Sequence, residues 1–143
     1  MLAPDLLARV TTLDAAALCD ADKDIRVMDA GLRPVSSFRQ MVGRARTVRC
    51  RDDFLTVIQA LDESSPGEVL VIDGGGGTRA LAGELFATEA ARRGLAGIVI
   101  DGACRDTPGS PPSSSPCTPA GFARPQGPRS ASGRRNRPSS AAG

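Results

Sequence analysis

Two short segments carry the groups best suited to bind a small anion. Arg105 and Asp106 follow the apolar run 98–100. The arginine is a rigid two-pronged donor for carboxylates, and the aspartate is a hard oxygen ligand suited to Mg²⁺ or Mn²⁺. The second segment, Gly83–Phe86, has the sequence GELF inside a helical pattern. A helix that begins near Gly83 has free backbone N–H groups that can hold a carboxylate, so the two segments together could bind a 2-oxo acid.

The elements that position these segments alternate between helix and strand. Apolar spacing predicts helices over 13–21, 52–64 and 78–94, the first of them capped by Asp14. Alternating or continuous apolar runs predict strands within 43–51, 66–73 and 96–103. Strand, helix and strand at this spacing indicate a right-handed βαβ crossover, hence a single α/β domain with a parallel or mixed sheet. Loops at the carboxyl ends of adjacent parallel strands meet in one crevice, which would bring the two segments together.

The glycine run 74–77 supports a second interpretation. Gly75, Gly77 and Ala80 fit the pattern G-x-G-x-x-A of dinucleotide-binding proteins, and Asp101 lies about where a ribose-binding acid belongs. The run comes late in the chain, however, and little sequence follows to complete such a domain. A phosphate-binding P-loop is excluded because no G-K-[ST] follows the glycines.

The distribution of charged residues along the chain changes near residue 106. Residues 1–106 hold all sixteen carboxylates and thirteen of the eighteen Lys and Arg, whereas 107–143 hold five Arg and no acid. The second part also contains eight of the eleven prolines and eight serines. We therefore expect an α/β domain over 1–106 and a disordered Pro/Ser/Arg-rich tail over 107–143. The tail lacks interleaved aromatic residues, so nucleic-acid binding is not expected.

Cysteines and hydropathy narrow the class of protein further. The four cysteines have no C-x-x-C spacing and the chain has no histidine, so zinc binding is not expected. No run approaches the roughly 20 apolar residues that cross a bilayer, and the start lacks a signal pattern. The sequence thus predicts a cytoplasmic protein with reduced thiols and no membrane partner.

Three runs resemble one known family. VMDAGLRPV, MVGRARTVRC and the long run GEVLVIDGGGGTRALAGELFATEAARRGLAGIVIDGACRD are similar to the RraA-like family, which includes 4-hydroxy-4-methyl-2-oxoglutarate aldolases and the regulator of ribonuclease activity A. The resemblance covers about 10–106 and implies the swivelling β/β/α type of fold, here incomplete. It also implies a homotrimer where the full-length frame is intact.

The resemblance implies a role for each site residue. The backbone of Gly83, Glu84, Leu85 and Phe86 and the side chain of Arg105 would bind the pyruvyl group of a 2-oxo acid, and Asp106 would hold the divalent cation. The implied enzyme is a divalent-metal-dependent class II aldolase, an oxo-acid lyase that cleaves its substrate to pyruvate. Oxaloacetate decarboxylation passes through the same enolate. The alternative is a non-catalytic regulator that binds a ribonuclease E-type enzyme, because fold alone cannot separate the two branches.

The tail departs from the family directly after Asp106. When the codons that the residues from 115 onward allow are read one base out of register, they permit Pro, Leu or Val, Tyr or His, Ala, Arg and Gly in order. Family members resemble P-[LV]-[YF]-A-R-G at this distance from the Arg-Asp pair. We therefore expect that the tail is an out-of-frame translation, and that the family's last strands are absent from the chain as written.

Overall fold

A computed structural model describes residues 4–28, 30–35, 40–51, 53–77, 80–105 and 120–123, the last group by its backbone alone. In chain order the elements are α1 (Pro4–Thr11), α2 (Ala15–Ala21), β1 (Arg33–Pro34), β2 (Ala45–Arg49), α3 (Leu55–Asp62), β3 (Val69–Asp73), β4 (Ala80–Ala82), α4 (Glu84–Arg92), β5 (Gly97–Asp101), β6 (Ala103–Cys104) and β7 (Ala120–Ala123). Helices and strands alternate through the middle of the chain, which confirms the α/β class.

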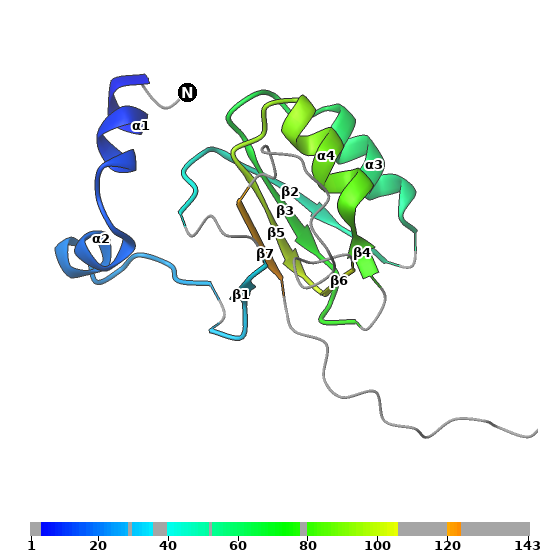
Figure 1. Ribbon diagram of the computed structural model, residues 1–143. Helices are drawn as coiled ribbons and strands as arrows, with labels where there is room; N and C mark the ends of the chain where they lie inside the picture. The colour runs from blue at the N-terminus through cyan, green and yellow to red at the C-terminus, as the bar shows by residue number, and fades with distance from the viewer. Residues whose placement is uncertain are drawn as a thin grey trace, which may run out of the picture.

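The main sheet has five strands in the order β1-β7-β5-β3-β2. Strands β2, β3 and β5 are parallel, with Ala45 opposite Val69 and Val69 opposite Gly97. Helix α3 connects β2 to β3 and α4 lies between β3 and β5, so both crossovers advance in one direction and place their helices on the same face (Figure 1). Helices α1 and α2 lie beside this body rather than on it (Figure 1).

The core lies between the sheet and its two helices. Leu70, Ile72 and Val57 are the largest fully buried side chains. Leu70 and Ile72 alternate along β3 and so share the face that meets α3 and α4, and Ile98 and Ile100 do the same on β5. The continuous apolar runs of β3 and β5 are thus buried as their sequences predict, and this core fixes the strand ends that carry the site.

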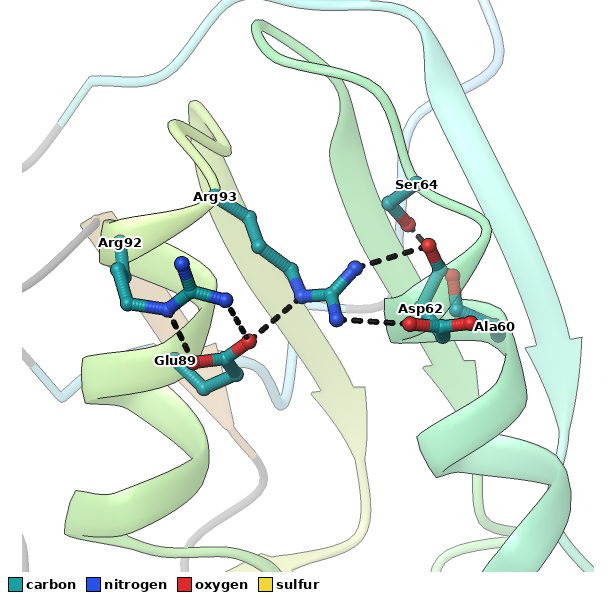
Figure 2. Close-up of polar contacts among 6 residues, drawn as sticks. All are labelled: Ala60, Asp62, Ser64, Glu89, Arg92 and Arg93. Carbon is teal, nitrogen blue, oxygen red and sulfur yellow. Dashed lines mark hydrogen bonds and ion pairs between the residues drawn. The ribbon is translucent and has the colours of Figure 1, made fainter.

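Charged groups pair with one another at the amino end of the sheet. Arg93 follows the last turn of α4 and reaches across to α3, where its guanidinium donates to the Asp62 carboxylate (2.7 Å) and carbonyl (2.9 Å) (Figure 2). The same guanidinium donates to Glu89 at 2.7 Å, and Glu89 also accepts from Arg92 at 2.7 Å. The network ties the ends of the two helices together.

The Glu68 carboxylate stabilises the turn that leads into β3. It accepts hydrogen bonds from the Ser65 amide and from Arg46 Nε, each at 3.0 Å, and the residue is only 8% exposed. The Ser65 amide and then Arg46 hold the pKa of Glu68 below its ordinary value. The group is therefore charged at neutral pH, and its burial is compensated by its partners.

Two segments differ from the sequence-based expectation. The helical pattern over 78–94 begins as strand β4, and α4 starts only at Glu84. Alanine and leucine suit both conformations, and pairing of β4 with β6 decides between them.

The second difference lies in the segment 107–143, for which composition predicts disorder. Residues 120–123 form β7, which pairs parallel with β5 and antiparallel with β1. An open edge of β5 supplies hydrogen-bonding partners that composition alone does not reveal. The other residues of 107–143 lie outside the described part.

No helix in the described ranges is long and apolar enough to span a membrane.

Candidate functional site

The carboxyl end of the sheet carries the candidate site. Strands β3 and β5 end at Asp73 and Asp101, opposite each other in register. The Asp101 carbonyl accepts hydrogen bonds from the amides of Gly74 (3.0 Å) and Gly76 (3.2 Å), which joins the two strand ends. The short parallel pair β4–β6 continues the chain past this edge. The site is therefore built on backbone that the sheet holds in place.

Helix α4 begins without a side-chain cap. Its N-cap residue is Gly83, in an extended conformation, and the first helical bond runs from the Ala87 amide to the Gly83 carbonyl at 3.0 Å. Among the described residues, none accepts a hydrogen bond from the amides of Glu84, Leu85 or Phe86. Unpaired first-turn amides and the helix dipole favour a bound anion.

Arg105 lies next to this helix start. Its amide donates to the Ala82 carbonyl at 3.0 Å, one residue before Gly83, and the residue is exposed. The β4–β6 pairing thus brings together the backbones of the two segments that the sequence singled out. Asp106 lies outside the described residues, so its role as a metal ligand stays a prediction.

A pocket of about 910 Å³ opens at the same end of the sheet. Its walls come from the ends of β2 and β3, the start of α3, the glycine loop and β4. The lining residues are Arg49, Cys50, Arg51, Phe54, Asp73, Gly74, Gly75, Gly77, Ala80 and Leu81. Sequence reasoning missed the two arginines because they were treated as part of a half-buried strand. Strand β2 ends at Arg49, so the alternation of a strand could not place Arg51.

The charges of the pocket are arranged around Asp73. Its carboxylate accepts from Arg49 Nε at 2.8 Å and from the Gly75 amide at 3.1 Å. These two hydrogen bonds, Arg49 first, keep the pKa of Asp73 below its ordinary value. Arg49 is therefore held by a partner that stays ionised, whereas Arg51 makes no hydrogen bond or ion pair with any described residue.

The glycine loop does not offer a row of free amides. Gly74 and Gly76 donate to Asp101, Gly77 donates to the Gly74 carbonyl at 3.3 Å, and Gly75 donates to Asp73. The loop also leads into β4 and not directly into a helix. A dinucleotide fingerprint needs the glycines to open the helix that receives the pyrophosphate, and this arrangement lacks that junction.

An aromatic contact connects the pocket to the start of α4. The rings of Phe54 and Phe86 lie 5.9 Å apart between centroids, tilted by 58°. Phe54 lines the pocket, and Phe86 is the third residue of α4. The pocket and the helix start are thus adjacent.

A metal centre is not assembled within the described part of the chain. It contains no group of three or more His, Cys, Asp or Glu side chains that could hold an ion. The predicted cation site depends on Asp106, beyond these residues.

The chain is similar to curated proteins and to solved structures. It is 38% identical over 104 residues to a Halalkalibacterium halodurans protein named "Putative 4-hydroxy-4-methyl-2-oxoglutarate aldolase", covering 71% of this chain and 50% of that protein. The chain thus spans about half the length of this relative.

Two solved structures share the fold. The RNA-processing inhibitor RraA from Thermus thermophilis superposes with a TM-score of 0.67 at 30% identity, covering 78% of this chain and 66% of that one. A Geobacillus kaustophilus structure, described as S-adenosylmethionine:2-dimethylmenaquinone methyltransferase, gives 0.68 at 34% identity over 78% and 68%. The family model described as RraA-like, Aldolase/RraA, matches residues 15–143. The chain, with its strand-and-helix order, the uncapped start of α4 and the neighbouring Arg105, therefore belongs to the RraA-like family.

Proposed function

We propose that this protein is an aldolase that cleaves 4-hydroxy-4-methyl-2-oxoglutarate to pyruvate, with its 2-oxo acid site at the start of α4 beside Arg105. The observation that carries the proposal is the 3.0 Å hydrogen bond from the Arg105 amide to the Ala82 carbonyl. It holds the arginine at the helix terminus whose first amides have no described acceptor. The name of the 38% identical relative supports the same reaction.

The chemistry assigned to this chain is anion binding and charge stabilisation. The amides of Glu84, Leu85 and Phe86 bind the substrate carboxylate at the positive end of the helix. Arg105 donates hydrogen bonds to the 2-oxo oxygen. A base takes the proton of the 4-hydroxyl group, the bond between C3 and C4 breaks, and C4 becomes the ketone carbon of one pyruvate. Negative charge then develops on the 2-oxo oxygen as the enolate of the second pyruvate forms, and the guanidinium stabilises it. Loss of carbon dioxide from oxaloacetate gives the same enolate, so we expect that activity too.

A divalent cation, for which the resemblance implies Asp106 as ligand, would polarise the 2-oxo oxygen when bound. Mg²⁺ and Mn²⁺ both suit a carboxylate ligand.

Binding of pyruvate tests the site separately from turnover. Saturation-transfer NMR on the full chain should detect pyruvate, and Arg105→Ala should weaken it by at least about tenfold, as expected for loss of a charge-assisted hydrogen bond. Arg105→Lys should restore part of the affinity. Arg9→Ala, which removes an exposed arginine on α1, is the matched control and should bind like the wild type. Equal pyruvate affinity in Arg105→Ala and wild type would contradict the proposal.

Turnover is measured by coupled release of pyruvate from 4-hydroxy-4-methyl-2-oxoglutarate, with and without Mg²⁺. Asp106→Ala should lose the activity, and adding Mg²⁺ should not restore it. Metal-independent release in the wild type would show that the cation plays no part.

Regulation of a ribonuclease is the second candidate function. It is favoured by the 30% identity to a structure described as an RNA-processing inhibitor. If this chain is such a regulator, it should slow RNA cleavage by a purified ribonuclease E-type enzyme, and Arg105→Ala should leave that effect unchanged. Inhibition without any binding of pyruvate would favour this function over the aldolase.

Self-association belongs to the same proposal. Leu85, Leu55 and Ile58 are 86%, 55% and 48% exposed, and large exposed apolar side chains commonly mark protein contacts. We expect a homotrimer where the frame beyond Asp106 is that of the family. Light scattering on this chain and on a frame-restored chain measures the difference.

A further inference from the structure

We propose that the pocket at the ends of β2 and β3 binds the second carboxylate of a dicarboxylic 2-oxo acid, and that Arg51 selects dicarboxylates over monocarboxylates. The inference rests on the proposed function, because the first carboxylate must be bound at the start of α4. It adds a residue that the sequence pattern did not assign, Arg51, to a site whose proposed substrates already carry two carboxylates.

The position of the pocket fits an extension of the first site. Leu81 lines the pocket, and Gly83 lies two residues further along the same chain, a distance of about 7 Å at the usual rise of a strand. The ring of Phe54, which lines the pocket, is in contact with the ring of Phe86 at the helix start. The two sites are thus neighbours, as the proposal requires.

The charge of the pocket favours an anion. The described lining residues include two arginines, Arg49 and Arg51, but only one carboxylate, Asp73. Arg49 is engaged by Asp73 at 2.8 Å. Arg51 is exposed and makes no ion pair with a described residue. Among the described lining residues, one guanidinium is thus available for a ligand, and its planar fork matches a carboxylate.

The shape of the pocket limits the class of anion. Cys50, Phe54 and Leu81 supply apolar wall next to the arginines, suited to the carbon chain between two carboxylates. All four amides of the glycine loop are already donors to protein acceptors, so the loop does not present the cluster of N–H groups that binds phosphate. A short dicarboxylate fits both features.

The test compares two ligands that differ in one carboxylate. 2-Oxoglutarate and 2-oxobutyrate share the 2-oxo acid group, and their affinities for the full chain are measured by calorimetry at constant ionic strength. Wild type should prefer 2-oxoglutarate. Arg51→Ala should weaken 2-oxoglutarate about tenfold and 2-oxobutyrate less than about twofold, because only the first ligand reaches the pocket. Arg51→Lys should retain part of the preference.

The matched control is Arg44→Ala. Arg44 is also exposed but precedes β2, at the opposite end of the strand, so its removal changes the net charge equally. A selective loss of 2-oxoglutarate in this variant would overturn the inference by showing a general charge effect. Equal weakening of both ligands by Arg51→Ala, or of neither, would overturn it as well.

Arg105→Ala separates failure of this inference from failure of the proposed function. It should weaken both ligands, because both carry the 2-oxo acid group. If 2-oxobutyrate binds Arg105→Ala as well as wild type, or if wild type binds neither ligand, the proposed function fails and the inference with it. If Arg105→Ala weakens both while Arg51→Ala weakens neither, only the second subsite is wrong.

Discussion

The two ends of the parallel sheet use their charged residues differently. At the amino end, Glu68 is paired with Arg46, and Arg93 connects Glu89 to Asp62. At the carboxyl end, Arg49 has Asp73 as partner, but Arg51 has none among the described residues, and α4 starts with three amides that lack a described acceptor. One end uses its charges to hold elements together. The other keeps donors available, which is what a ligand site requires.

Two glycines, one near each end of the sheet, have different surroundings. At the amino end, a Cβ added to Gly43 would overlap the Gly67 carbonyl oxygen, so the chain is packed against itself. At the carboxyl end, a Cβ on Gly77 would meet only the Gly74 carbonyl oxygen, at 3.4 Å. Close packing at Gly43 and open space at Gly77 predict that substitutions at these two positions separate stability from binding. The contrast belongs to these two positions, since Gly74, also at the carboxyl end, is packed against Leu81.

The largest effect is expected for Gly43→Ala. Because the new methyl group meets a backbone atom that cannot move alone, unfolding free energy should fall by about 2–3 kcal/mol. Gly77→Ala is the counterpart in the pocket and should cost less than about 1 kcal/mol. Denaturant unfolding measures both. Similar losses in the two variants would contradict the contrast between Gly43 and Gly77.

Glu68→Ala should follow in size. The substitution removes the buried carboxylate that accepts hydrogen bonds from the Ser65 amide and Arg46, at a cost of about 1–3 kcal/mol. Glu63→Ala is the matched control, since Glu63 is exposed and its contact with Arg46 is long, at 3.5 Å. It should change stability by less than about 0.5 kcal/mol. Thermal unfolding of the two variants under one set of conditions decides the point.

Arg93→Met should have a smaller effect than Glu68→Ala. The methionine keeps much of the aliphatic stem but removes the donors that connect α4 to α3 (Figure 2). The unfolding midpoint should fall measurably, whereas Arg51→Met, in the pocket, should leave it unchanged. A drop for Arg51→Met equal to that for Arg93→Met would mean that the pocket arginine is also structural.

The smallest effect is expected from acid titration of Glu89. Its hydrogen bonds with Arg92 first and then Arg93 lower the pKa of Glu89 to about 2. A depressed folded-state pKa means that the stabilisation is present above the ordinary value of 4.5 and is lost as pH falls from there toward about 2. Glu89→Gln should flatten the stability profile in that window. Because the group is partly exposed, added salt should reduce the difference.

Much of the fold could be predicted because its signals are local. The apolar runs of β3 and β5 and the capping aspartate of α2, whose Oδ1 accepts from Ala17 at 2.7 Å, determine their elements within a few residues. Strands β4 and β7 could not be predicted in this way. Their residues, largely Ala, with Leu81, Gly121 and Phe122, have weak preferences, and pairing with β6 and β5 from elsewhere in the chain determines their conformation.

The candidate site was predictable to a similar degree. The neighbouring backbones of Arg105 and Gly83 follow from the rule that parallel strands end at one edge. The pocket arginines follow from no single segment, because Arg51 becomes part of a pocket only when β2, the glycine loop and α3 are assembled. The predictions for the residues between β6 and β7 concern a segment outside the described residues, so they stay predictions.

Strand β7 also constrains the order in which the chain can fold during its synthesis. Residues 33–34 join the main sheet only by pairing with 123 and 122. While the chain is being synthesised, these early residues must wait for almost ninety later ones before they have a place to dock, and the edge of β5 stays uncovered in the meantime. If translation stops soon after Arg105, the product would therefore have an exposed edge at β5, and β1 would lack its pairing strand. Chaperones and proteases recognise chains of this form.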